Sequence, residues 1–269
     1  MKKMMTALAA FTLTAGLAAC SSGDDTETAT TAAAGDISGN WMIELDSAEF
    51  ENDNREYLLA DGTFECKSCN PPFSMAATGE WQDLDRPGAD KGMIEVVDDR
   101  TVKSAYQFKG KDTGNSIWTV SEDGTTMKLD FTSMTGDETV NGSETYTRTG
   151  DAPDGAHAVS GQWSNNGPDS VDEAALRAMY NVEGDQFSFD GNNGSYTATL
   201  GGEPVAIEGN NSGMMVAVER MGENGYRETY SRDGETLSVT ELTIDGDTMS
   251  GVSTDARDDS KVRWTATRK

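Results

Sequence analysis

Ser38-Gly39-Asn40-Trp41 and Ser160-Gly161-Gln162-Trp163 are two copies of one short pattern, and they stand 122 residues apart. The same distance separates Asp123-Gly124-Thr125-Thr126-Met127 from Asp245-Gly246-Asp247-Thr248-Met249. Several aromatic, methionine and glycine positions between these blocks repeat at 122 or 123 residues. Because chance matches would not keep one register across a whole unit, the sequence indicates a tandem duplication.

Each copy carries the patterns of antiparallel β-structure. Apolar and polar residues alternate in Met127–Thr132 and again in Tyr196–Leu200, as in strands with one buried face. Asx-Gly pairs, which supply the positive φ of tight hairpins, separate such runs. These pairs are Asp61-Gly62, Asp123-Gly124, Asn141-Gly142, Asn224-Gly225, Asp233-Gly234 and Asp245-Gly246. The sequence therefore predicts an all-β fold whose neighbouring strands connect antiparallel.

Two stretches depart from simple alternation. From Leu237 to Ile244 the apolar parity shifts by one residue, which predicts a β-bulge. In Ser170–Tyr180 an N-cap candidate precedes acidic residues and strong helix formers. We expect a short helix or turn at Val171–Ala175 that runs into a strand from about Leu176.

Each copy opens with Gly-x-Trp and closes with an arginine on its terminal strand, at Arg148 and Arg268. This resembles the lipocalin and wider calycin pattern, in which an early Gly-x-Trp packs against a basic residue of the last strand and plugs one end of an up-and-down barrel. The resemblance implies that Trp41 pairs with Arg148 and Trp163 with Arg268. It also implies two tandem lipocalin-like β-barrels, or half-barrels, at residues 36–150 and 158–269, joined by a linker at 151–157.

The N-terminus reads as an export signal. Lys2 and Lys3 precede the uncharged run Met4–Ala19, which is too short to span a bilayer as a helix. The run ends in Leu17-Ala18-Ala19-Cys20, which resembles the lipobox of bacterial lipoproteins; the alternative is an ordinary signal peptide with a chance cysteine. The resemblance implies removal of residues 1–19 and attachment of a membrane lipid to Cys20. The chain as a whole is also similar to duplicated lipoproteins of Gram-negative bacteria, a family without an assigned activity.

Residues 20–35 contain no large apolar side chain, so we expect a flexible tether there. Removal of residues 1–19 takes away two lysines and no acidic residue, which changes the net charge from −26 to −28. Such a charge repels phosphate backbones and anionic headgroups, so nucleic acid is not an expected partner. The residue after Cys20 is Ser21. Enterobacterial lipoproteins that are retained at the inner membrane have Asp at this position, so we expect this lipoprotein to be sorted to the outer membrane.

When Cys20 is set aside for the lipid, two of the three cysteines remain, Cys66 and Cys69, and they are spaced as Cys-x-x-Cys. An even number of remaining cysteines is expected in an oxidising compartment. We expect a structural disulfide, with a redox pair or a metal site as alternatives. A redox Cys-x-x-Cys pair is expected at the start of a helix. Here Asn70-Pro71-Pro72 follows the pair, and the two prolines prevent a helix. Zinc would need further ligands, and the one histidine, His157, lies in an apparent linker, where we expect it to be solvated.

We find no catalytic motif, so we expect no enzyme activity; a hydrolase is the least favoured reading. No catalytic carboxylate pair stands out among the 47 acidic residues. The oxygen-rich loops Asp190–Gly194 and Glu208–Gly213 contain ligand types that calcium prefers, but we read them as hairpin turns rather than as a metal site. We expect no cofactor.

The barrel interior remains the candidate functional region. Units of this kind bind small apolar ligands, although large side chains can also fill a small barrel completely. The candidate lining residues are Phe64, Phe73, Met93, Trp118, Phe131, Phe187, Tyr196 and Met215. We expect a membrane-anchored module that binds a small apolar or amphipathic ligand. The alternative is an envelope scaffold or protein-interaction domain with filled barrels.

Overall fold

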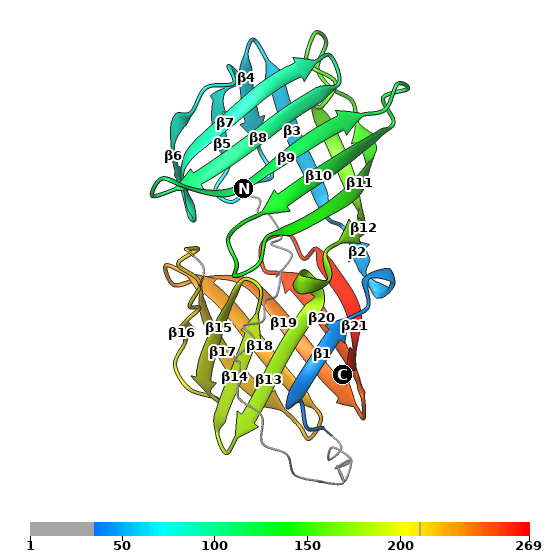
Figure 1. Ribbon diagram of the computed structural model, residues 1–269. Helices are drawn as coiled ribbons and strands as arrows, with labels where there is room; N and C mark the ends of the chain where they lie inside the picture. Colours follow the sequence, from blue (N-terminus) through cyan, green and yellow to red (C-terminus); the bar gives the residue numbers. More distant parts are fainter. Residues whose placement is uncertain (1–34, 210) are drawn as a thin grey trace, which may run out of the picture.

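The computed structural model describes residues 35–209 and 211–269, and it contains two antiparallel barrel-like β-sheets stacked end to end (Figure 1). All strand pairs are antiparallel, as the sequence predicts. The expected signal peptide (1–19), the lipidation site Cys20 and nearly all of the tether lie outside the described residues. Gly35, which we assigned to the tether, is instead buried against Glu223 and Asn224 in the turn between two strands of the second copy.

The first barrel contains ten strands. In spatial order they are β5 (Phe73–Ala76), β4 (Thr63–Cys66), β3 (Asn54–Ala60), β12 (Gly161–Val171), β11 (Val140–Gly150), β10 (Thr126–Ser133), β9 (Lys111–Val120), β8 (Thr101–Phe108), β7 (Ala89–Asp98) and β6 (Gln82–Arg86).

The second barrel repeats this order. Its strands are β15 (Gly194–Thr199), β14 (Gln186–Gly191), β13 (Arg177–Glu183), β1 (Gly39–Ile43), β21 (Lys261–Arg268), β20 (Thr248–Asp255), β19 (Glu235–Asp245), β18 (Gly225–Arg232), β17 (Met215–Met221) and β16 (Val205–Ala206), and β2 (Glu49–Glu51) pairs with the far part of β21.

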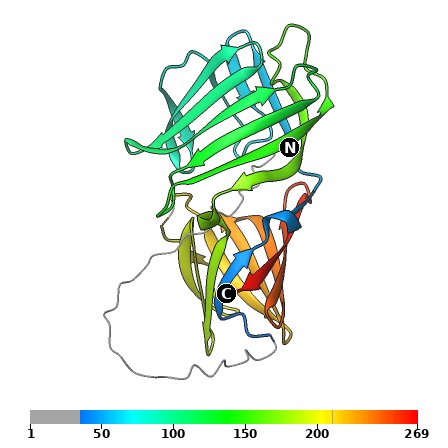
Figure 2. The ribbon, with the colours of Figure 1, turned by 45° about the vertical axis from the view of Figure 1, so that its right-hand side comes forward.

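The two copies exchange their first strands. β1 comes from the first copy but lies between β13 and β21 of the second, where Figure 2 shows it in blue beside the red β21. Conversely, β12 opens the second copy but lies between β3 and β11 of the first. The predicted division into units 36–150 and 158–269 is therefore wrong for these strands, and each barrel is built from both copies.

The connections after the exchanged strands explain why the prediction failed. In an unexchanged up-and-down barrel a hairpin would fold the first strand back onto its neighbour. Here Asn52 and Asp53 alone separate β2 from β3, and the chain crosses into the other barrel. The second crossing uses the 3-10 helix η2 (Glu173–Leu176) before β13, close to the expected short helix at Val171–Ala175. A further 3-10 helix, η1 (Leu45–Ser47), separates β1 from β2.

Short contacts close both barrels where the sheet ends meet. In the first barrel the Gln82 side-chain amide donates a hydrogen bond to the Ala76 carbonyl at 2.7 Å and accepts one from the Ala76 backbone N–H at 3.2 Å. In the second barrel Ser195 and Glu208 exchange two backbone hydrogen bonds of 2.9 and 3.0 Å. These bonds link β5 to β6 and β15 to the segment just after β16, so the described sheets are nearly closed barrels.

Most turn predictions are confirmed, because five of the six Asx-Gly pairs lie at turns between consecutive strands. Asn141-Gly142 is the exception, since both residues lie inside β11. A Cβ atom at Gly142 would approach the Phe131 ring to 2.5 Å, so glycine serves close packing there rather than a turn. The predicted bulge is confirmed at Leu237, which is skipped where β18 pairs with β19.

Candidate functional site

The end of the first barrel remote from the second is plugged by Trp163 and Arg148. The Arg148 guanidinium lies 4.0 Å from the centre of the fully buried Trp163 ring. The indole Nε1 donates to the Val159 carbonyl at 3.0 Å. Arg148 also donates to the carbonyls of Ala158 and Ser160. One cation thus joins the last strand of the first copy to the segment that opens the second.

The second barrel contains the same plug with the other two residues. Arg268 lies over the Trp41 ring at 4.3 Å, and Trp41 Nε1 donates to Ile37 O at 2.8 Å. Arg268 donates to the carbonyls of Asp36 and Ser38. The predicted plug residues are therefore correct, but their pairing is wrong: Trp41 pairs with Arg268 and Trp163 with Arg148. The strand exchange carries each tryptophan into the other copy's barrel. Each cation–π contact contributes about 0.5–2 kcal/mol.

The candidate lining residues fall into three groups. Phe64, Phe73 and Trp118 pack in the first interior, and Phe187 and Tyr196 pack in the second. There they contact other large side chains; for example, the Phe64 and Trp118 rings stack at 5.4 Å.

Three candidates do not line an interior. Met93 and Met215 point outward, because Ile94 and Val216, one residue further on, are the fully buried positions. Side chains of successive strand residues lie on opposite faces, and we chose the wrong parity. Phe131 lies instead in a separate small cluster with Val140 and η2. That cluster covers the junction end of the first barrel.

A buried carboxylate in the second interior escaped the sequence analysis. Glu228 is 2% exposed, and its two oxygens accept hydrogen bonds from the hydroxyls of Tyr196 and Tyr230. Burial raises the pKa of Glu228, although the two tyrosine hydrogen bonds oppose that shift. The alternation Tyr226-x-Glu228-x-Tyr230 could have revealed it, because it places the glutamate on the aromatic, inward face.

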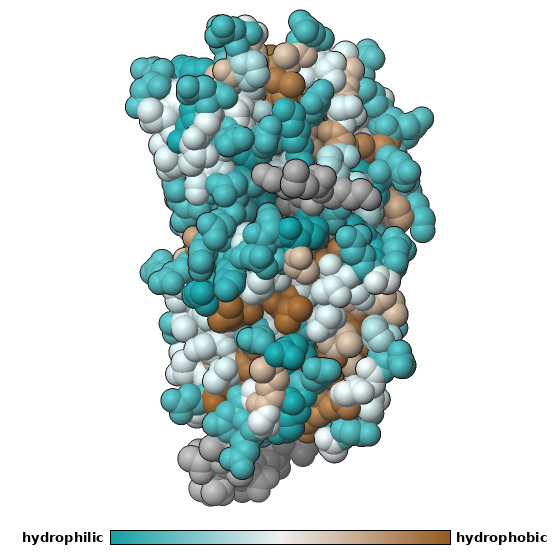
Figure 3. All heavy atoms as spheres, turned by 180° about the vertical axis from the view of Figure 1, so that it is seen from behind, coloured by the Kyte–Doolittle hydropathy of each residue, from teal (hydrophilic) through white to brown (hydrophobic). Residues whose placement is uncertain are grey.

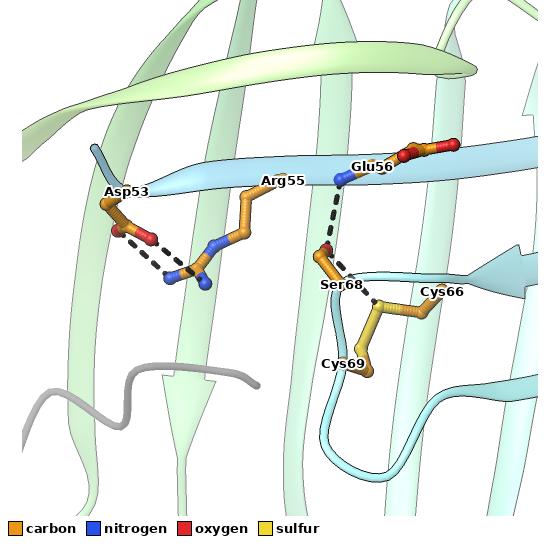
Figure 4. Close-up of a disulfide and its surroundings, with 6 residues drawn as sticks. All are labelled: Asp53, Arg55, Glu56, Cys66, Ser68 and Cys69. Atoms are coloured by element: carbon orange, nitrogen blue, oxygen red, sulfur yellow. Dashed lines mark hydrogen bonds and ion pairs between the residues drawn. A yellow bond between two sulfur atoms is a disulfide. The ribbon is translucent and has the colours of Figure 1, made fainter. Parts of the chain in front are cut away.

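The first barrel contains a buried ion pair near the crossing between the barrels. Asp53 and Arg55 lie 3.1 Å apart (Figure 4). Asn165 of β12 donates its backbone and side-chain N–H groups to Asp53 at 2.9 Å. Burial opposes the charge on Arg55, but Asp53 and other groups raise its pKa above the ordinary value. This network binds the exchanged strand β12 to the crossing segment.

Cys66 and Cys69 form the expected disulfide, with Cα atoms 5.4 Å apart (Figure 4). Both cysteines are buried in the first interior. Ser68, inside the loop that the disulfide closes, accepts a hydrogen bond from the backbone N–H of Glu56 at 3.0 Å. The disulfide thus fixes the end of β4 against β3, as expected of a structural bond.

His157 is half-buried rather than a solvated linker residue. Its Nδ1 accepts from the Val159 backbone N–H at 3.2 Å, so Nε2 carries the proton and donates to Asp98 O at 2.7 Å. Asp98 ends β7. The histidine therefore ties the β11–β12 connection to β7 across the plugged end, which is a structural role.

The structure also contains two pockets that open to solvent, and the larger reaches Tyr180 and Tyr196 of the second interior. The larger, of about 480 Å³, lies along β13–β16, and the smaller, of about 310 Å³, lies beside β3 and the start of β12. Hydrophilic side chains cover most of the face in Figure 3, and apolar ones form small patches on both barrels. Neither pocket is enclosed as a ligand cavity inside a barrel would be.

Comparison with protein-family models, with curated proteins and with solved structures gives no match for this chain. Within the described residues, no helix has the length and apolar character needed to cross a bilayer. The fold and its plugs therefore define a class by architecture alone: a strand-exchanged tandem of antiparallel barrels.

Proposed function

We propose that this chain is a non-enzymatic lipoprotein of the cell envelope that binds another protein through its outer surface, with the two barrels as filled, rigid supports. The packing of the interiors supports this reading most directly. Trp41, Trp163, Phe64, Phe187 and Tyr226 are among the fully buried side chains. A carrier of small apolar ligands would need room that these side chains occupy.

The lipid anchor is part of the same proposal. Leu17-Ala18-Ala19-Cys20 directs lipid attachment to Cys20, and Ser21 after it favours the outer membrane. The mature chain is strongly acidic, so its folded part has no electrostatic attraction to anionic headgroups. We expect the Cys20→Ala variant to be released from the membrane fraction. Its retention in the detergent phase would contradict the anchor.

The outer face of β6–β9 is the surface we assign to the partner. Trp81, just before β6, is 42% exposed, and Val97 of β7 and Ile117 of β9 are also exposed. β-strand register places this tryptophan beside β7, because the next residue, Gln82, pairs with Gly92. Exposed tryptophan is enriched at interaction hot spots. The acidity of the chain favours a partner with a basic surface.

Photo-cross-linking in native envelopes tests this assignment. A photoreactive residue at position 81 should give one cross-linked protein whose yield falls with added salt. The same residue at Met179, which is equally exposed on the second barrel, is the matched control and should give none. No product at position 81 would contradict the interaction surface. Native mass spectrometry that finds a stoichiometric small ligand would favour a carrier instead.

A further inference from the structure

Two loops meet where the barrels join. The β10–β11 loop belongs to the first barrel, and the Gly191–Gly194 hairpin joins β14 to β15 in the second. Thr135 donates a hydrogen bond to Asn193 Oδ1 at 3.0 Å. A Cβ atom at Gly136 would lie only 2.0 Å from the Asn192 carbonyl oxygen. Residue 136 must therefore be glycine for the two loops to approach so closely.

Asn192 is an unsatisfied amide at this contact. The residue is 1% exposed, yet neither its Oδ1 nor its Nδ2 has a hydrogen-bond partner. Its φ is not positive, so the turn itself does not require asparagine. The amide faces the β10–β11 loop, because its Oδ1 would lie 2.9 Å from a Cβ atom at Gly136. A buried polar group without a protein partner is costly, so we expect a bound ion or water to satisfy it.

Each of the two loops carries a carboxylate within two residues of this contact. Asp190 precedes Asn192 by two residues on the hairpin, and Asp137 follows Gly136 on the opposite loop. The close approach of Gly136 to Asn192 and the Thr135–Asn193 hydrogen bond bring the backbone at Asp137 and the backbone at Asp190 to the same junction. Neither carboxylate forms an ion pair with a lysine or arginine of the described residues. The two loops thus bring negative charge and an unpaired amide oxygen together.

We propose that a divalent cation, calcium by the chemistry of its ligands, binds between the two loops. Asp137, Asp190 and the Oδ1 of Asn192 would hold it, and backbone oxygens and water would complete the six to eight ligands that calcium takes. Among the described residues no three acidic, cysteine or histidine side chains form a metal cluster. With two carboxylates, the affinity should match that of weak extracellular calcium sites, about 0.1–1 mM.

Such a cation would join the barrels. Asp137 lies in a loop of the first barrel and Asp190 in a strand of the second, so one bound ion would hold both sides of the junction. It would also neutralise the repulsion between the two carboxylates. The oxygen-rich loop Asp190–Gly194 is thus a hairpin, as the sequence predicts, and in addition part of a ligand site. The other such loop, Glu208–Gly213, is described except for Asn210.

Terbium luminescence on the mature lipoprotein in detergent micelles tests the site. Tyr180 and Tyr196 line the pocket that includes Asp190, so excitation of tyrosine should sensitise bound terbium. We expect saturable emission that calcium displaces with a half-effect at about 0.1–1 mM. Asp190→Asn and Asn192→Leu should each weaken calcium displacement at least tenfold. Leucine has nearly the shape of asparagine but offers no oxygen.

The control is Asp61→Asn, which removes an exposed carboxylate in the β3–β4 turn, where asparagine suits the positive φ. It should leave terbium emission and calcium displacement unchanged. Absence of saturable emission would overturn the proposal. So would equal weakening by Asp61→Asn and Asp190→Asn, since it would indicate diffuse attraction of cations to the acidic surface.

Discussion

Trp163→Ala should weaken the first barrel, although Trp163 belongs to the second copy of the repeat. The side chain is fully buried beneath Arg148. At about 25 cal/mol per Å², burial of roughly 200 Å² of indole stabilises the fold by about 5 kcal/mol. The methyl group of the alanine and local relaxation of the structure reduce the part of this energy that the variant loses. The variant also loses the cation–π contact and leaves the Val159 carbonyl without its donor. We expect a net loss of about 3–5 kcal/mol.

Hydrogen exchange read by mass spectrometry is the suitable assay, because it reports each barrel separately where a whole-chain transition would not. Amides of β3–β11 should lose protection, and those of β13–β20 should keep it. Trp81→Ala, which truncates a largely exposed side chain, is the control and should cost about 1 kcal/mol or less. Loss of protection mainly in β13–β20, or equal effects of the two variants, would refute the reasoning.

Three further predictions concern the interiors. Asp53→Asn should cost about 3 kcal/mol in urea unfolding, because the buried Arg55 charge loses its carboxylate partner; a cost within error would contradict this. The raised pKa of Glu228 means that the folded state binds a proton more strongly than the unfolded state, so stability should fall as pH rises from about 4.5 through the folded-state pKa. Glu228→Gln should flatten that slope in thermal scans, and an unchanged slope would exclude Glu228 as its source. Replacement of Cys66 and Cys69 by serine should cost about 2 kcal/mol, since the disulfide closes a very short loop; global unfolding would show a larger role.

The sequence predicts the repeated β-structure well because its signals are local. Alternation, Asx-Gly turns and the parity shift near Leu237 each depend on neighbouring residues, and the structure confirms nearly all of them. The Gly-x-Trp and terminal arginine also predict which residues form the plugs.

The same signals could not predict which tryptophan pairs with which arginine. Both copies carry the same plug residues, so Trp41 fits Arg148 as well as Arg268 in sequence terms. The clue lies in the connections: neither Glu51–Asn54 nor Val171–Arg177 contains an Asx-Gly turn to reverse the chain. The inward position of Glu228 was predictable from alternation, but the contact of Asn192 with Gly136 depends on the junction between the barrels.

Cysteine cross-linking tests the exchange of first strands most directly. Met42 of β1 pairs with Thr267 of β21, and the equivalent position of β12, Ser164, pairs with Thr147 of β11. In a Cys20→Ser background, Met42→Cys with Thr267→Cys should therefore form a disulfide on mild oxidation. Met42→Cys with Thr147→Cys should not. A disulfide in the second pair and none in the first would show that each copy keeps its own first strand, and would contradict the exchanged barrels.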